Sequence, residues 1–178
     1  MKLLMHICCS NCSIYPLQQL QKDGMSIYGL WYNPNIHPLS EYNERMDSLK
    51  TLQDEVGLDV EYIDDYGLID FVRNVVGRET DRCEYCYYTR LEETAVKAKE
   101  NGCDAFTSSL LVSPFQKFEL LMKTGNEIAI KHDIEFLDRD FRSGYRIGRE
   151  MAKEMGLYSQ KYCGCIYSEM DRNRKRTK

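Results

Sequence analysis

The sequence has no long apolar run. A helix needs roughly 18 apolar residues to span a bilayer, and no stretch of this 178-residue chain reaches that length. The apolar start, residues 1–7, is interrupted by Lys2 and His6 and is too short for a signal peptide. We therefore expect a cytoplasmic protein without a membrane partner.

The sequence also has no excess of positive charge. It carries 24 lysines and arginines against 28 aspartates and glutamates, for a net charge of −4, so no overall basic field indicates nucleic acid. The exception is a basic C-terminal tail, residues 169–178. Its cations are Arg172, Arg174, Lys175, Arg176 and Lys178. Such a tail is either a solvated chain end or an arm that binds phosphate groups.

Common cofactor and catalytic motifs are missing. The chain has neither a G-x-x-x-x-G-K-[ST] nor a G-x-G-x-x-G pattern, so we predict no bound nucleotide cofactor. Its three histidines form no Ser–His–Asp pattern. His6 falls in the first predicted strand and is expected to be packed, whereas His37 and His132 are expected at the surface.

Hydrophobic residues make up 43% of the chain and charged residues 29%, as is typical of a soluble globular protein. The length fits one domain, which we place at residues 1–168. The predicted strands are 2–7, 26–32, 58–63, 104–108 and 134–137. The predicted helices are 14–22, 40–56, 66–76, 83–100, 116–132 and 144–155. We expect Ser13 to cap the first helix after a turn at 8–13. This alternation predicts a single-domain α/β fold, a parallel sheet of about five strands with helices on both faces.

The chain is rich in cysteine, with eight residues of this type. A cytoplasmic domain of this size needs no disulfides, so clustered cysteines indicate metal or redox chemistry. Cys8, Cys9 and Cys12 follow the first predicted strand, where the start of a helix favours thiolates. Cys83 and Cys86 form a second cysteine pair at another predicted helix start.

Spacing alone leaves the metal open. Two C-x-x-C pairs are typical of a structural zinc site, and four thiolates equally suit an iron–sulfur cluster. Cys8 adds a fifth thiol that a closed zinc site would not use, and a domain with its own core needs no zinc to hold it together. A third alternative is that the thiols are packed as small apolar side chains.

Cys163 and Cys165 are separated by one residue, Gly164. A disulfide across so small a ring is strained, and strained bridges are typically labile or catalytic. Gly164 supplies the backbone freedom that such a ring requires. The pair is either a redox-active dithiol, two further metal ligands or two free thiols. Cys103 is expected to be buried packing.

Five segments carry a family resemblance. They read H-I-C-C-S-N-C-S (6–13), R-C-E-Y-C-Y-Y-T-R-L (82–91), F-T-S-S-L-L-V-S-P (106–114), D-F-R-S-G-Y (140–145) and Y-S-Q-K-Y-C-G-C-I-Y-S (158–168). Together they resemble the QueH type of epoxyqueuosine reductase, a cobalamin-independent oxidoreductase, over nearly the whole chain. Where the family usually has Ala-Pro between the second and third thiols, this chain has Ser10-Asn11.

The resemblance implies a nucleotide-hydrolase-like (HUP-like) fold and the reduction of epoxyqueuosine to queuosine at the wobble position of tRNA. The implied [4Fe-4S] ligands are Cys8, Cys9, Cys83 and Cys86. Cys163 and Cys165 match the redox-active disulfide of the family. Cys12 is then free to face the substrate or to hold a second iron, with help from Asp104. The implied partners are tRNA carrying epoxyqueuosine and an electron donor.

Two other functions remain open at this point. A tRNA-thiolating enzyme on the same fold would need an ATP-binding loop after the first strand, which the sequence lacks. A zinc-stabilised RNA-binding module would hold zinc and catalyse nothing. For any RNA partner, Arg142, Arg146 and Arg149 are candidates for contacts to phosphates, together with the tail.

Overall fold

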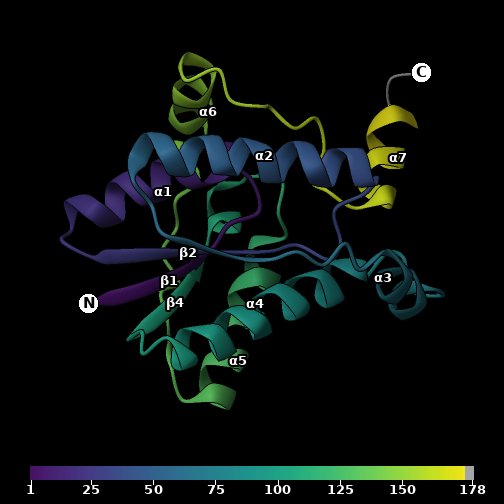
Figure 1. Cartoon of the computed structure of the whole chain (residues 1–178). Coiled ribbons are helices and arrows are strands. Elements are labelled where there is room, and N and C mark those ends of the chain that lie inside the picture. The colour runs from purple at the N-terminus through teal and green to yellow at the C-terminus, as the bar shows by residue number, and fades with distance from the viewer. Residues whose placement is uncertain (175–178) are drawn as a thin grey trace.

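Five parallel strands form the central sheet (Figure 1). The computed structural model describes residues 1–174. The strands are β1 (Lys2–His6), β2 (Ser26–Tyr32), β3 (Val60–Ile63), β4 (Ala105–Ser108) and β5 (Glu135–Phe136). Their order is β3-β2-β1-β4-β5, and Leu4 of the central β1 pairs with Tyr28 on one side and with Phe106 on the other. All five predicted strands are confirmed, with ends that shift by a residue or two.

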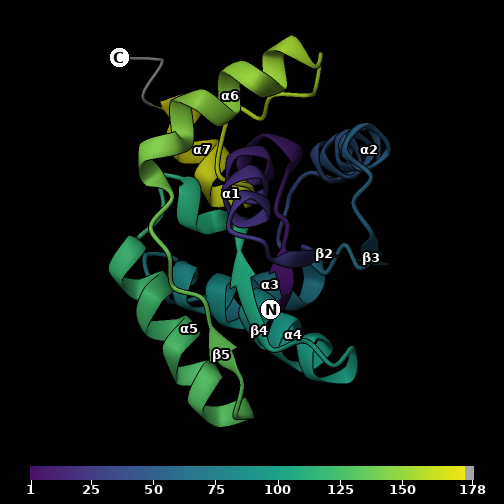
Figure 2. The same cartoon turned by 90° about the vertical axis from the view of Figure 1, so that its left-hand side faces the viewer.

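Helices cover both faces of this sheet, as predicted (Figure 1, Figure 2). One face carries α1 (Ser10–Lys22) and α2 (Leu39–Val56), and α6 (Tyr145–Glu154) packs against α1. The other face carries α4 (Arg82–Glu100) and α5 (Phe118–His132), and α3 (Leu68–Val75) packs against α4. Because both faces are covered, β1 is buried at every position from Leu3 to His6 rather than at alternate ones.

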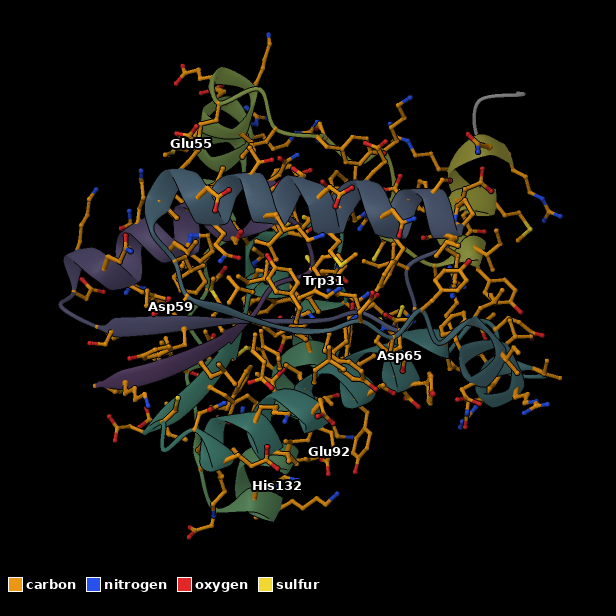
Figure 3. All side chains as sticks on the ribbon, viewed as in Figure 1. Trp31, Glu55, Asp59, Asp65, Glu92 and His132 are labelled. Carbon is orange, nitrogen blue, oxygen red and sulfur yellow. The ribbon has the colours of Figure 1, made fainter. Side chains whose placement is uncertain are left out.

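Trp31 marks the core between α2 and the sheet (Figure 3). Its ring is fully buried and meets the ring of Tyr42 edge-on, with centroids 5.4 Å apart. The indole Nε1 donates to the Tyr42 hydroxyl at 3.1 Å, and that hydroxyl donates to Asp64 Oδ1 at 2.9 Å. Both buried polar atoms therefore have partners, and α2 is fixed in place over β2.

The start of α1 differs from the prediction. The helix begins at Ser10, and Cys9 rather than Ser13 is its N-cap. Ser13 lies inside the first turn, where its hydroxyl donates to the carbonyl oxygens of Ser10 at 2.8 Å and Cys9 at 3.2 Å. The expected turn at 8–13 is thus wrong, and Cys12 is helical.

One helix near the C-terminus was not predicted. It is α7 (Ile166–Arg174), which includes residues 169–174 of the predicted basic tail. Lys175, Arg176 and Lys178, which belong to the predicted tail, lie outside the described residues. Two short 3-10 turns were not predicted either, η1 (Ser109–Val112) and η2 (Arg142–Gly144). Within residues 1–174, none of the helices is both long enough and apolar enough to cross a membrane.

The strand order places the functional region. After β1 the chain turns to α1 on one face, and after β4 it turns through η1 toward α5 on the other face. In parallel sheets of this kind, ligands bind beyond the carboxyl ends of the strands at the point where the order reverses. Cys8 follows β1 and Ser109 follows β4, so both lie at this switch point.

Candidate metal centre

Cys8, Cys9 and Cys12 form a compact group at the start of α1, called the thiol triad below. Cys12 lies one helical turn after the N-cap Cys9, which brings the two side chains to one side of the helix. The three sulfurs lie within 4.8 Å of one another, with Cys8 and Cys9 3.7 Å apart. All three side chains are buried. The thiol triad can therefore hold a metal ion or part of a metal cluster.

Two side chains from distant segments orient the thiol triad. The hydroxyl of Ser109, just after β4, accepts from the Cys8 backbone N–H at 3.0 Å and donates to Cys8 Sγ at 3.4 Å. The amide of Gln160 donates to Cys9 Sγ at 2.9 Å and to Cys12 Sγ at 3.4 Å. Donors aimed at sulfur favour its anionic form, which is the form that binds metals.

The thiol triad ionises unevenly. Hydrogen bonds from the thiols of Cys12 and Cys9 hold the pKa of Cys8 well below its usual range. The hydrogen bond to Cys8 raises the pKa of Cys12, and burial raises the pKa of Cys9. One proton therefore leaves readily, and full deprotonation needs a positive ion in the site.

The second cysteine pair lies on α4. Cys83, Cys86 and Arg90 are three and then four residues apart, so they share one face of this helix. Burial raises the pKa of Cys83, and it raises the pKa of Cys86 to about 12. These two thiols are therefore neutral in the absence of a metal.

The positive charge of Arg90 influences thiols in all three cysteine groups. Its side chain is only 2% exposed, and its Nε donates to Asn35 Oδ1 at 2.7 Å. No carboxylate of residues 1–174 pairs with it. Its charge acts on one thiol from each group, Cys8, Cys86 and Cys163. Because an uncompensated buried charge is costly, the buried guanidinium favours the anionic form of these thiols.

Arg45 of α2 holds the segment that carries Cys163. The side chain is buried, and its Nη1 and Nη2 donate to the carbonyl oxygens of Cys163 at 2.8 Å and Tyr162 at 2.9 Å. Its Nε donates to Glu41 Oε1 at 2.7 Å. The backbone N–H of His37 donates to the Gly164 carbonyl at 2.8 Å. The segment is therefore fixed from both sides by buried groups.

Gly164 is required by the backbone at this point. Its φ of 157° lies in a region that other residues rarely adopt, and an added Cβ would come within 3.3 Å of Ile36. Cys163 accepts a hydrogen bond from the Gln116 amide at 3.3 Å. Cys165 interacts with the guanidinium of Arg82. Both cysteines are free thiols in this structure.

A cavity of about 990 Å³ joins the thiol triad to Cys163. Its lining includes Cys8, Cys12, Ser113, Phe115, Gln116, Tyr145, Arg149, Ser159, Gln160, Lys161, Tyr162, Cys163, Ser168, Asp171 and Arg172. Sulfurs from two distant parts of the sequence thus face one space, which lies at the switch point of the sheet. The predicted tail contributes Asp171 and Arg172 to this cavity.

One predicted site residue lies elsewhere. Asp104 precedes β4, and its Oδ2 accepts from the backbone N–H of Lys2 at 2.7 Å, at the amino end of the sheet. The length of β1, roughly 13 Å at 3.3 Å per residue, separates this end from Cys12. The predicted second iron between Cys12 and Asp104 does not fit this fold.

The histidines give a mixed outcome. His6 is fully buried as predicted, and its ring nitrogens contact Ser108 Oγ at 2.9 Å and Asn33 Oδ1 at 3.2 Å. The expectation of a surface position for His37 is wrong, because the residue is 1% exposed and packs against the rings of Tyr66 and Phe71. His37 follows the loop after β2, which folds under the Cys163 segment.

His37 makes stability depend on pH. Burial, with the nearby charge of Arg90, lowers the pKa of His37 from 6.5 to about 4. Below pH 6.5, His37 is protonated in the unfolded chain but stays neutral in the folded chain. The free energy of unfolding therefore falls as the pH drops toward 4. Between pH 7 and pH 4.5 we expect His37 to account for a loss of about 2–3 kcal/mol in the free energy of unfolding. Urea denaturation at the two pH values measures it, because His37→Leu should lack this part of the loss that the wild type shows. Equal pH dependence in the two proteins would contradict it.

Fold and site together define a class. The chain is a doubly wound α/β protein with a cysteine-rich helix start at the position where dinucleotide-binding proteins of doubly wound topology have a phosphate-binding loop. The family profile described as epoxyqueuosine reductase QueH matches residues 3–171. The chain belongs to the QueH family.

Named relatives agree with this assignment. The epoxyqueuosine reductase QueH of Dehalococcoides mccartyi is 36% identical over 96% of this chain and 94% of the relative. That of Thermotoga maritima is 31% identical over 97% and 93%, and that of Streptococcus pyogenes is 36% identical over 93% and 69%. A solved structure, titled a predicted subunit of tRNA methyltransferase from Methanocaldococcus jannaschii, superposes with a TM-score of 0.57 at 16% identity and covers 98% of this chain and 88% of its own. It confirms the fold class.

The structure also adds residues that the sequence analysis missed. They are Arg45, Arg90, Ser109, Gln116 and Gln160. Arg45 and Arg90 carried a usable signal, because each falls on the apolar face of its helix, three residues after Tyr42 and Tyr87 respectively. A charged residue on a buried helix face needs a specific partner. The two glutamines and Ser109 had no such signal.

Proposed function

We propose that this protein is a tRNA-modifying epoxyqueuosine reductase that works in the cytoplasm. It binds tRNA carrying epoxyqueuosine, removes the epoxide oxygen and leaves queuosine. A [4Fe-4S] cluster is held by Cys8, Cys9, Cys83 and Cys86. The family assignment and the near-complete coverage of two named relatives support this function.

The observation that carries the metal–thiolate centre is the buried guanidinium of Arg90. Its charge lowers the pKa of one thiol each from the start of α1, from α4 and from the Cys163 segment, and it has no carboxylate partner in residues 1–174. Two of the implied ligands are buried at a helix start, and two share the α4 face with Arg90. This donor set fits a centre that carries net negative charge.

The reaction has a simple balance. Conversion of an epoxide to an alkene consumes two electrons and two protons and releases one water. A cluster held by these four cysteines would supply electrons one at a time. Oxidation of Cys163 and Cys165 to a disulfide releases two electrons and two protons, the amount consumed, and an external electron donor then restores the dithiol. Cys12 and Cys163 line the same cavity, where they can contact the substrate.

The cavity suits a nucleoside that has left the base stack. Its volume of about 990 Å³ is at the upper end of the usual range for small-molecule sites. Enzymes that modify a base commonly turn it out into such a pocket. The reacting ring would enter beside Cys12 and Cys163, while the rest of the tRNA stays outside.

Turnover and metal content test the function together. Protein purified without oxygen and supplied with iron and sulfide should be brown, and with a chemical reductant it should convert epoxyqueuosine in tRNA to queuosine, detected as the loss of one oxygen from the nucleoside. Bound zinc with no colour and no turnover would favour an RNA-binding module instead. ATP binding with sulfur transfer would favour a tRNA-thiolating enzyme, for which the short β1–α1 connection leaves no phosphate loop.

The Cys163–Cys165 pair has a separate expected result. In Cys163→Ser/Cys165→Ser, iron content and visible absorption should match the wild type, while the rate of turnover falls. Serine keeps the size of each side chain but cannot form a disulfide. Loss of iron from this variant would show instead that the two thiols are ligands.

A further inference from the structure

A second, basic groove adjoins the thiol cavity. It has a volume of about 500 Å³ and lies along α6 and the segment that follows it. Its lining is Asn11, Arg146, Arg149, Glu150, Lys153, Gly156, Leu157 and Ser159. Arg149 and Ser159 line both this groove and the thiol cavity. The two spaces are therefore neighbours across one arginine.

Cations without partners concentrate around these two spaces. In residues 1–174, most lysines and arginines form ion pairs or hydrogen bonds, and those that form neither are Lys22, Arg73, Arg146, Lys153, Lys161 and Arg172. Of these, Arg146 and Lys153 line the groove, while Lys161 and Arg172 line the thiol cavity. The whole chain carries a net charge of −4. The local excess of positive charge thus runs against the overall balance, which favours an anionic ligand here.

The geometry of α6 gives these charges a common direction. Arg146, Arg149 and Lys153 are three and then four residues apart, so they lie on one side of the helix. Arg149 is held by the hydroxyls of Tyr145 and Ser159, each at 3.1 Å. Arg142, which the sequence analysis also named as a candidate for phosphate contacts, is paired with Asp140 at 2.7 Å and does not line the groove. Glu150 is the one acidic side chain in its lining.

An exposed aromatic ring distinguishes RNA from a small anion. Phe115 is 77% exposed at the rim of the thiol cavity, and its ring meets that of Tyr145 edge-on at 5.7 Å. Single-stranded RNA is recognised by such a combination of a basic track for the phosphates and aromatic side chains that stack on bases. A free phosphate would use the cations alone.

We propose that the α6 groove binds the RNA backbone next to the reacting nucleoside. This inference rests on the proposed function for its substrate, and it adds where the tRNA lies. With the nucleoside in the thiol cavity, the adjoining phosphates follow Arg149 to Arg146 and Lys153, and a neighbouring base stacks on Phe115.

Salt-dependent binding tests the groove without requiring turnover. The variant is Arg146→Ala/Lys153→Ala, and the control is Lys22→Ala/Arg73→Ala, which removes the same charge from partnerless cations elsewhere. The probe is a fluorescent anticodon stem-loop RNA with a plain guanosine at the wobble position, titrated from about 50 to about 200 mM salt. Each lost phosphate contact should lower the slope of log K against log salt by about 1. In the groove variant this slope should therefore be lower by about 2, and binding at low salt should be roughly tenfold weaker. The control should match the wild type in both.

The outcomes separate the groove from the reaction. An unchanged slope in the groove variant, or an equal loss in the control, overturns the proposed groove even if the protein reduces epoxyqueuosine in tRNA. A groove-dependent slope in a protein that never reduces epoxyqueuosine supports the RNA track and rejects the proposed function. All four replaced side chains are exposed, so both variants should unfold at the same temperature as the wild type. Thermal unfolding checks this.

Discussion

Replacing Cys86 with alanine is expected to remove iron and abolish epoxide reduction together. The Cys86 thiol lies on the α4 face shared with Cys83 and Arg90, and burial raises its pKa to about 12. A thiol so reluctant to ionise binds strongly only where a metal takes the place of the proton. Removing it leaves three of the four proposed ligands and one anion fewer to offset the charge of Arg90. Iron analysis and the visible spectrum measure the first effect, and turnover of tRNA measures the second.

Cys103 provides the matched control. This half-buried thiol lies between α4 and β4, near Lys2 and Asp104 at the opposite end of the sheet. Cys103→Ala removes one sulfur, as Cys86→Ala does, but it should leave iron content and turnover unchanged. A colourless Cys86→Ala protein that still reduces epoxyqueuosine would exclude the proposed role of Cys86. Equal loss of iron in both variants would point to a general effect of cysteine removal.

Local patterns were sufficient to predict the strands and most helices. Apolar runs such as residues 3–5 can be buried on both faces of a parallel sheet, and Gly24, Gly57, Gly102 and Gly156 end elements with positive φ. The start of α1 was mispredicted because Ser13 is a good capping residue in isolation. In the fold, its hydroxyl instead turns back to carbonyl oxygens of the preceding turn, and the helix gains one more turn.

The grouping of the cysteines near the start of α1 could be predicted from the sequence, but their long-range hydrogen-bond partners could not. Sequence spacing identified Cys8, Cys9 and Cys12 as one group, and the structure brings these sulfurs together. Only the strand order shows that Asp104 lies at the wrong end of the sheet for Cys12. Gln160 and the thiol triad are about 150 positions apart in sequence. Helix and strand periodicity relates only residues that are close in sequence, so it could not predict this contact. Long-range polar contacts of this kind appear only after the chain is folded.

The largest expected loss of stability follows from Arg45→Met. Arg45 is 1% exposed and satisfies Glu41 and two carbonyl oxygens of the Cys163 segment. Methionine fills much of the space but leaves the Glu41 carboxylate buried with Tyr158 as its remaining partner. Breaking one half of a buried ion pair typically costs about 3–5 kcal/mol, and we expect a loss of that size in the free energy of unfolding, measured by urea denaturation of the reduced, metal-free protein.

Two comparisons make the Arg45 result specific. Lys50→Met breaks an exposed ion pair with Asp47 on the same helix, and it should cost less than about 1 kcal/mol. In Glu41→Gln/Arg45→Met the unpaired carboxylate is absent, so part of the lost stability should return. The Cys163 segment would still lack its two guanidinium hydrogen bonds, and Cys163 in the double variant should react faster with a thiol reagent than in the wild type. If Arg45→Met is no more destabilising than Lys50→Met, the buried guanidinium does not hold this segment, and the position of Cys163 over the thiol cavity must have another cause.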